Sequence, residues 1–118
     1  MYKKKALILE DDKIVAFLEK EILEREGFEV EVAGDGVEGL EKVSQSVYDL
    51  IISDIIMPRM RGDEFYLAVR RLGQGLEKKI IFVSGSVDDF IKSTGNKFLY
   101  KPFTSKLLAQ TVRDVFAN

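Results

Sequence analysis

The sequence of 118 residues contains no cysteine and no histidine. Without cysteine, the chain has no disulfide framework and no thiolate chemistry. Without histidine, it has no imidazole for a catalytic dyad or triad, for metal ligation or for a phosphohistidine. A phosphate group, if the chain carries one, must therefore sit on another type of side chain.

A long apolar run and a strong net charge are also missing. The apolar run after Lys3–Lys5 is too short for a signal peptide or a membrane span, so we expect a cytoplasmic protein without membrane insertion. Lysine and arginine number 18 against 20 aspartate and glutamate residues, a net charge of -2. We therefore expect no direct binding of nucleic acid, and we interpret Lys3–Lys5 as a solvated, frayed start. The length predicts one domain over residues 1–118.

Five short apolar segments alternate with amphipathic ones, which predicts a parallel sheet covered by helices. The predicted strands are Ala6–Leu9, Phe28–Val32, Leu50–Ser53, Ile80–Ser84 and Phe98–Tyr100, of which we expect the third and fourth to be the most buried. The first predicted helix is Lys13–Glu26, which carries Ile14, Leu18, Ile22 and Leu23 at helical spacing. A second helix is marked by Val37, Leu40 and Val43, and a third by Phe65, Ala68, Val69 and Leu72. The last predicted helix is Ser105–Phe116, which follows a Thr104 cap.

Polar side chains stand where four of the predicted strands end. They are Glu10 and Asp11 after the first strand, Asp54 after the third, Ser84 on the fourth and Lys101 after the fifth. In a doubly wound α/β sheet, ligands bind beyond the carboxyl ends of the strands. In the strand order 2-1-3-4-5, the third strand lies about 4.8 Å from the first and the fourth, so these side chains can converge.

Converging carboxylates need positive charge beside them. Two of them about 5 Å apart repel by roughly 3 kcal/mol at an effective dielectric constant of 20. Lys101 supplies one charge, and an all-oxygen cluster with room for water suits Mg²⁺. An aspartate beside Mg²⁺ and a lysine is placed to attack phosphorus and form an aspartyl phosphate. Mg²⁺ and Lys101 would neutralise the developing charge, and Ser84 could donate to a phosphoryl oxygen.

Four segments, in this order, resemble response-regulator receiver domains of two-component signalling: LILEDD, DLIISDIIMPRMRGDEF, IIFVSG and FLYKPF. The resemblance spans essentially the whole chain and implies an α/β, flavodoxin-like, doubly wound five-stranded parallel sheet of order 2-1-3-4-5. It implies that a histidine kinase or histidine phosphotransfer protein donates a phosphoryl group to the chain, which then switches conformation for output. A downstream effector and a phosphatase are further expected partners. The chain would be a signalling module and not an enzyme, apart from self-phosphorylation and autodephosphorylation.

The resemblance also assigns roles around the acidic cluster. Asp54 is the expected phosphoacceptor, and Glu10 and Asp11 are the acidic pair that holds the cofactor Mg²⁺ with it. The backbone carbonyl of Ile56 completes this metal site. We interpret Asp12, the third consecutive acid, as a helix cap and not as a ligand.

Further roles fall on the fourth and fifth predicted strands. Ser84 takes the position of the family's switching hydroxyl, and Lys101 that of its active-site lysine. Phe98 takes the position of the aromatic residue whose rotamer reports phosphorylation, and Gly85 leaves space for the phosphoryl group. The resemblance further implies a cis bond between Lys101 and Pro102.

Two other functions stay open. A pseudo-receiver would keep the fold and bind proteins without being phosphorylated, although the complete set of acids, hydroxyl and lysine argues against it. The segment GDGVEG, with Gly34, Gly36 and Gly39, fits the dinucleotide motif G-x-G-x-x-G. The chain is too short for two mononucleotide-binding halves, so a tight turn with close helix packing is the better interpretation.

Two further readings are rejected. A phosphatase of the haloacid dehalogenase type needs a second aspartate two positions after the nucleophile, where this chain has Ile56. The RGD segment at residues 61–63 is interpreted as a turn at Gly62 followed by acids in the first turn of a helix, and not as an adhesion motif.

The clearest departure from the family is the spacing of Ser84 and Lys101, which are 17 positions apart, several fewer than in most receivers. This spacing predicts a shortened fourth helix from Asp88 to about Thr94, ended by Gly95. Similar shortening appears in receivers attached to hybrid kinases. Because the chain ends just after its last predicted helix, we expect either a free-standing regulator or a domain of a longer protein.

Overall fold

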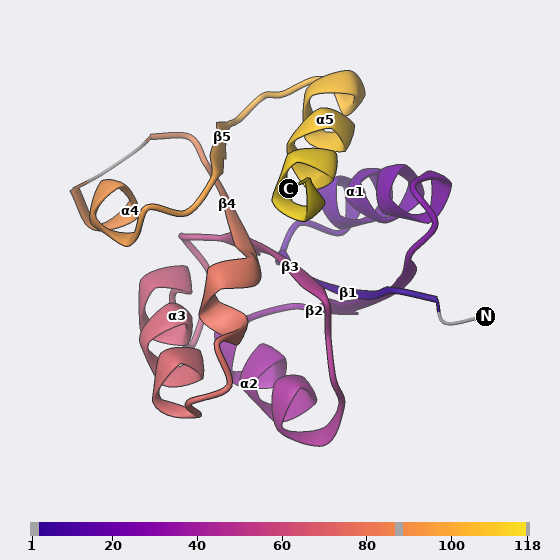
Figure 1. Cartoon of the computed structure of the whole chain (residues 1–118). Coiled ribbons are helices and arrows are strands. Elements are labelled where there is room, and N and C mark those ends of the chain that lie inside the picture. Colours follow the sequence, from indigo (N-terminus) through magenta and orange to yellow (C-terminus); the bar gives the residue numbers. More distant parts are fainter. Residues whose placement is uncertain (1–2, 87–88, 118) are drawn as a thin grey trace.

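The computed structural model of the chain describes residues 3–86 and 89–117. Its centre is a five-stranded sheet of order β2-β1-β3-β4-β5, in which every neighbouring pair is parallel (Figure 1). The strands are β1 (Lys5–Leu9), β2 (Glu29–Ala33), β3 (Leu50–Asp54), β4 (Ile80–Ser84) and β5 (Phe98–Tyr100). The predicted fold class and strand order are therefore confirmed.

Helices follow the strands as the sequence predicts. They are α1 (Lys13–Arg25), α2 (Gly36–Gln45), α3 (Gly62–Arg71), α4 (Asp89–Thr94) and α5 (Ser105–Phe116), with an unpredicted 3-10 helix, η1 (Leu76–Lys79). The shortened α4 is confirmed, although its predicted first residue, Asp88, lies outside the described residues. Gly95 ends it with a φ of 72°. Within the described ranges, no helix is long and apolar enough to cross a membrane.

The strands divide the core into two layers, because successive side chains point to opposite faces of a sheet. Leu7 and Leu9 belong to the cluster on the side of α2, α3 and α4, whereas Ala6 and Ile8 belong to the cluster on the side of α1 and α5. Figure 1 shows these two groups of helices on the two faces. All residues of β3 and β4 are buried, as predicted, since both faces of these strands are covered.

Helix α1 buries only part of the apolar stripe that marks it in the sequence, namely Leu23 and, less completely, Ile22. Ile14 is 74% exposed and Leu18 52% exposed. Leu23 is joined on the buried face by Ala16 and Glu19, and these three residues also recur at helical spacing. The helix thus turns part of its apolar stripe to solvent and places a glutamate against the protein interior.

Lys5 corrects the prediction of a solvated, frayed start. It is the first residue of β1, and its Nζ lies 3.1 Å from Glu31 Oε2 on the neighbouring strand. The same ammonium group lies over the Tyr48 ring, 5.2 Å from its centroid. Strand pairing makes the difference, because Lys5 pairs with Glu29 in register and so gains partners that local sequence does not reveal.

Candidate functional site

The register of the sheet brings the ends of β1, β3 and β4 to one edge. Leu9 pairs with Ser53, and Asp54 pairs with Val83, so Glu10 and Asp54 stand side by side just beyond or at the ends of their strands. The ladder continues past β1, because the Glu10 amide donates to the Ala33 carbonyl at 3.0 Å. On the other side, the Lys101 amide donates to the Ser84 carbonyl at 2.8 Å.

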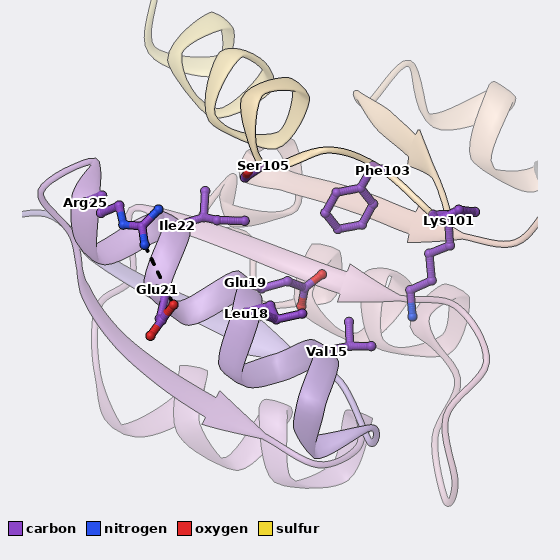
Figure 2. A pocket seen from close by; sticks show the side chains of 10 residues that line it. Val15, Leu18, Glu19, Glu21, Ile22, Arg25, Lys101, Phe103 and Ser105 are labelled. Atoms are coloured by element: carbon purple, nitrogen blue, oxygen red, sulfur yellow. Dashed lines mark ion pairs between the residues drawn. The ribbon is translucent and has the colours of Figure 1, made fainter.

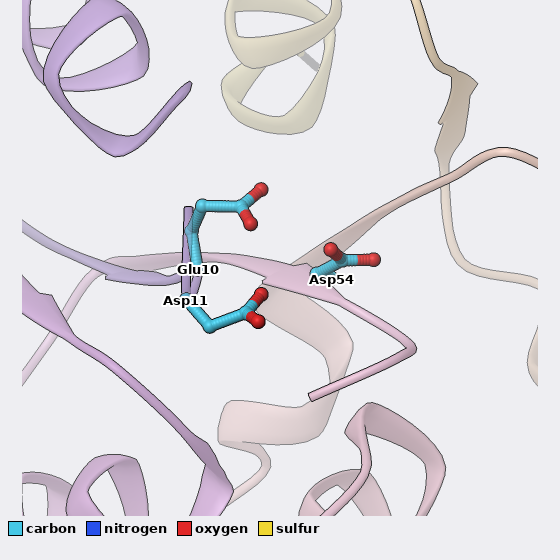
Figure 3. A group of neighbouring side chains, drawn as sticks. All are labelled: Glu10, Asp11 and Asp54. Carbon is cyan, nitrogen blue, oxygen red and sulfur yellow. The ribbon is translucent and has the colours of Figure 1, made fainter. Parts of the chain in front are cut away.

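Glu10, Asp11 and Asp54 form an acidic cluster at this edge (Figure 3). Each offers a carboxylate oxygen, and these oxygens all lie within 4.8 Å of one another. Glu10 and Asp54 are only 3% and 8% exposed, whereas Asp11 is exposed to solvent. Hard oxygen ligands with one side open to water are the donor set that Mg²⁺ prefers. The cluster is therefore suited to hold a divalent cation.

Lys101 bridges the two buried acids of this cluster. Its Nζ lies 2.7 Å from Glu10 Oε1 and 2.9 Å from Asp54 Oδ2. Burial raises the pKa of Glu10, against the hydrogen bonds from Lys101 and from the Asp12 amide. Burial lowers the pKa of Lys101, but the bonds to Glu10 and Asp54 outweigh it and leave that pKa above its usual range. The lysine therefore remains a cation between two carboxylates.

The position of Asp54 is set by contacts with its own loop. The Ile55 amide donates to Asp54 Oδ1 at 2.7 Å, and the Ser53 hydroxyl donates to the Asp54 carbonyl at 2.9 Å. At Gly62, a Cβ atom would stand 2.2 Å from that same carbonyl. Any side chain at Gly62 would therefore displace the end of β3, a constraint beyond the turn that the sequence predicts there. The predicted acids, Asp63 and Glu64, do lie in the first turn of α3.

Ser84 and its neighbours line the other side of the site. Ser84 is 6% exposed, and its hydroxyl accepts a hydrogen bond from the Ser86 amide at 3.3 Å. A Cβ atom on Gly85 would meet no atom within 4 Å, so the space above Gly85 is open. Phe98 is 36% exposed and packs edge to face on Tyr100, with ring centroids 5.8 Å apart. The bond between Lys101 and Pro102 is cis, as expected.

Asp12 caps helix α1, as predicted, and stands apart from the acidic cluster. Its Oδ1 accepts hydrogen bonds from the amides of Ile14 at 2.9 Å and Val15 at 3.2 Å. Its own amide donates to Glu10 Oε2 at 3.2 Å. Asp12 thus fixes the start of the helix and helps to orient Glu10. The side chain of Ile56 is 62% exposed, and its carbonyl remains a predicted ligand.

The glycine motif GDGVEG serves packing in this structure. A Cβ atom on Gly36 would lie 2.6 Å from the Met60 carbonyl, and one on Gly39 would lie 2.9 Å from Leu9 Cδ2. The Gly36 amide donates to that Met60 carbonyl at 3.2 Å. These contacts bring the start of α2 against β1 and against the loop after β3, which favours the packing interpretation of the motif over dinucleotide binding.

An ion pair that sequence reasoning missed ties two loops of the site together. Arg59, in the loop after β3, donates from Nε to Asp35 Oδ2 at 2.7 Å and from Nη2 to Asp35 Oδ1 at 3.1 Å. Asp35 also caps α2 through the Glu38 amide, at 2.9 Å. Arg59 has a φ of 65°, which is uncommon for a residue with a side chain. In the sequence, Asp35 is recognisable only as an acid in a glycine-rich turn, and nothing near it indicates that Arg59 is its partner.

Comparison with known proteins gives a consistent result. The family model described as "Response regulator receiver domain" matches residues 6–113. The transcriptional regulatory protein DltR of Streptococcus agalactiae serotype III (strain NEM316) is 32% identical over 112 residues, which cover 91% of this chain and 49% of DltR. The sensor kinase CckA of Brucella abortus (strain 2308) is 34% identical over 116 residues, covering 92% of this chain and 12% of that kinase.

Solved structures show the same similarity. The chemotaxis response regulator CheY4 of Vibrio cholerae aligns with a TM-score of 0.88 and 33% identity, covering 97% of this chain and 99% of that one. The receiver domain of the hybrid histidine kinase CckA aligns with a TM-score of 0.81 and 31% identity, covering 96% and 99% of the two chains. The chain thus spans about half the length of DltR and nearly all of each of these two structures.

Proposed function

Because this chain belongs to the response regulator receiver domain family of two-component systems, we propose that it accepts a phosphoryl group on Asp54 and changes conformation for output. The observation that carries this proposal is Lys101, whose ammonium group lies 2.9 Å from Asp54 and 2.7 Å from Glu10. A cation held against one carboxylate of a buried acidic pair is placed to neutralise charge that develops on a transferred phosphoryl group.

In the proposed reaction, a carboxylate oxygen of Asp54 attacks the phosphorus atom of a phosphohistidine on a partner kinase or phosphotransfer protein. The P–N bond breaks, its electron pair stays on the imidazole nitrogen, and an acyl phosphate forms on Asp54. Lys101 releases Asp54 and binds a phosphoryl oxygen. The nearby Ser84 hydroxyl donates to another oxygen, and the open space above Gly85 admits the group.

The acidic cluster is proposed to hold Mg²⁺ through Glu10, Asp11, Asp54 and the carbonyl of Ile56. When bound, the ion supplies positive charge that offsets the repulsion between the carboxylates and the incoming phosphoryl group. The support is the chemistry of the donors, because three carboxylates within 4.8 Å of one another carry more negative charge than the single ammonium group of Lys101 offsets.

Intact mass spectrometry after incubation with acetyl phosphate and Mg²⁺ tests the proposal. Wild type should gain the mass of one phosphoryl group, and Asp54→Asn should gain none. A parallel incubation with beryllofluoride should shift amide NMR signals around Ser84 and Lys101. If wild type shows neither change, the pseudo-receiver alternative is correct. If NAD(H) binds with micromolar affinity and metal ions do not compete with it, the result would instead support the dinucleotide alternative.

The metal site can be tested apart from phosphorylation. Asp11→Ala should abolish Mg²⁺ binding in a calorimetric titration, because Asp11 is the exposed member of the cluster. Asp12→Ala is the matched control on the adjacent residue, since its carboxylate caps α1. An equal loss of Mg²⁺ affinity in both variants would contradict the assignment.

The proposed switch couples Ser84 to Phe98. Phosphoryl oxygens draw in Ser84 and Lys101, and the space this leaves lets Phe98, now 36% exposed, turn inward. Ser84→Ala should still be phosphorylated on Asp54 but should leave the ring signals of Phe98 unchanged. Equal Phe98 shifts in variant and wild type would disprove the coupling.

A further inference from the structure

Helix α1 and the connection from β5 to α5 enclose a cavity of about 480 Å³. Figure 2 shows the side chains around it. Its walls are mainly apolar and come from Val15, Leu18, Ile22, Pro102 and Phe103. Lys101 reaches it from the candidate phosphorylation site, so the cavity lies directly beside that site without being part of the acidic cluster.

Glu19 lines this cavity as a buried acid without a partner. It is 1% exposed, and neither of its carboxylate oxygens accepts a hydrogen bond from any part of the chain that the structure describes. Burial, with smaller contributions from Glu10 and Asp54, raises the pKa of Glu19 to about 8, against the charge of Lys101. A buried polar group with no hydrogen bond destabilises the fold. Glu19 therefore has no partner within the part of the fold that the structure describes, and the cavity has room for a ligand that would supply one.

Each of the other charged side chains around the cavity is already paired with a group of opposite charge. Lys101 is bound to Glu10 and Asp54, and Arg25 Nη2 lies 3.8 Å from Glu21 Oε2. Glu19 is thus the acid of the lining that has no hydrogen-bond or ion-pair partner within the described residues. A complementary ligand carries a positive charge with hydrogen-bond donors at one end and an apolar stem that fits between Leu18, Ile22 and Phe103.

We propose that this cavity is a docking pocket for one arginine or lysine side chain of a partner protein, with Glu19 at its end as the ion-pair acceptor. A protein fits better than a free small cation because an apolar surface continues outside the pocket. Ile14, Phe17 and Leu18 are 74%, 59% and 52% exposed on the same helix. This row suits the apolar face of a partner helix, whose basic side chain then enters the cavity.

The entry of that side chain requires the Glu19 carboxylate to become accessible. The Glu19 oxygens are covered, and the half-exposed Leu18 side chain stands beside them. We expect a change of rotamer at Leu18 to uncover Glu19, because Leu18 lies outside the buried face of α1, which consists of Ala16, Glu19 and Leu23.

Two pairs of probes test the proposal on unphosphorylated protein without Mg²⁺, so the outcome is independent of the proposed phosphorylation. The first pair is n-propylguanidinium and its neutral isostere n-propylurea. The second is a helical peptide with one arginine flanked by leucines three and four positions away, and the same peptide with citrulline in place of the arginine. Affinities come from NMR titration of the amide signals of Leu18, Ile22 and Phe103.

Wild type should bind the arginine peptide about tenfold more tightly than the citrulline peptide, the difference expected for a charge-assisted hydrogen bond. Glu19→Gln and Glu19→Leu should bind the two peptides equally, and Glu19→Leu keeps the test valid if the glutamine variant folds poorly. Glu21→Gln, at the edge of the same cavity, is the matched control and should keep the full preference.

Equal affinity of wild type for the two peptides would overturn the proposal, as would an arginine preference that survives in both Glu19 variants. A preference for n-propylguanidinium over n-propylurea without any arginine preference in the peptides would also overturn it. In that case the pocket takes a small organic cation and not a side chain of a protein.

Discussion

Glu10 and Glu19 are both buried glutamates, 3% and 1% exposed, but their surroundings differ. Glu10 has the Lys101 ammonium group 2.7 Å away and a backbone amide at 3.2 Å, whereas the oxygens of Glu19 accept no hydrogen bond within the described residues. Burial raises the pKa of both. Burial alone therefore does not identify a functional acid. Glu10 belongs to a site in which Lys101 is its partner, whereas the lack of a partner at Glu19 among the described residues suggests that a ligand binds there.

The largest effect should come from removing the partner of Glu10. Lys101→Met leaves Glu10 and Asp54 without their shared cation, and we expect the free energy of unfolding to fall by about 3 kcal/mol. Urea denaturation at pH 7 without Mg²⁺ measures it. Lys106→Met on α5 is the control, because Lys106 is exposed, and should change little. Equal stabilities of Lys101→Met and wild type would show that the ion pairs contribute nothing.

The opposite sign is expected at Glu19. Glu19→Leu removes a buried group without a partner and replaces it with an apolar side chain, so the free energy of unfolding should rise by about 2 kcal/mol. Thermal and urea unfolding both measure this change. Glu21→Leu, at a half-exposed position at the edge of the same cavity, should alter stability by much less. Destabilisation by Glu19→Leu would show that Glu19 has a partner inside the fold.

The stabilisation by Glu19→Leu should also depend on pH. The pKa of Glu19 is raised from 4.5 to about 8, so folded wild type binds this proton more tightly than the unfolded chain does. Wild type therefore loses stability, relative to the variant, as the pH rises from about 4.5 to about 8. Unfolding curves of both proteins across this range should diverge with rising pH. A constant difference would contradict the raised pKa.

A smaller effect is expected where an acid is satisfied by backbone amides alone. Asp12→Ala removes the cap of α1 and should reduce the free energy of unfolding by about 1 kcal/mol. Asp12→Asn is the matched control, since its amide oxygen keeps the cap, and should recover most of the loss. A loss as large as that of Lys101→Met would mean that the cap also keeps the backbone amide of Asp12 in place to bond to Glu10.

The smallest expected effect is kinetic and concerns the open side of the acidic cluster. Ile56 is 62% exposed, so much of this apolar residue faces solvent beside the site. If Asp54 is phosphorylated as proposed, Ile56→Asn should speed loss of phosphate severalfold by orienting the attacking water. Phosphate release at saturating Mg²⁺ measures the rates, with Ile56→Ala as the control for shielding. Unchanged rates in both variants would mean that a partner phosphatase, and not Ile56, sets the lifetime of the phosphorylated Asp54.

Much of the fold and of the acidic cluster followed from local patterns. The apolar runs and the turn residues predicted each strand to within about a residue at either end, and α5 from Ser105 to Phe116. The acids and the lysine at the strand ends predicted that Glu10, Asp54 and Lys101 meet, because parallel strands carry their carboxyl ends to one edge. The short α4 followed from the spacing of Ser84 and Lys101.

Pairings between distant segments were decided only by the tertiary structure. Arg59 bonds to Asp35, 24 positions away, and Lys5 to Glu31, although neither cation carries a local signal of its partner. The rotation of α1 shows the same limit. Its residues form two stripes at helical spacing. Ile14 and Leu18, in one stripe, are exposed, whereas Ala16, Glu19 and Leu23, in the other, are buried. Periodicity determines that a helix forms, but packing against the sheet and α5 decides which side is buried, and so decided that Glu19 lies in a cavity.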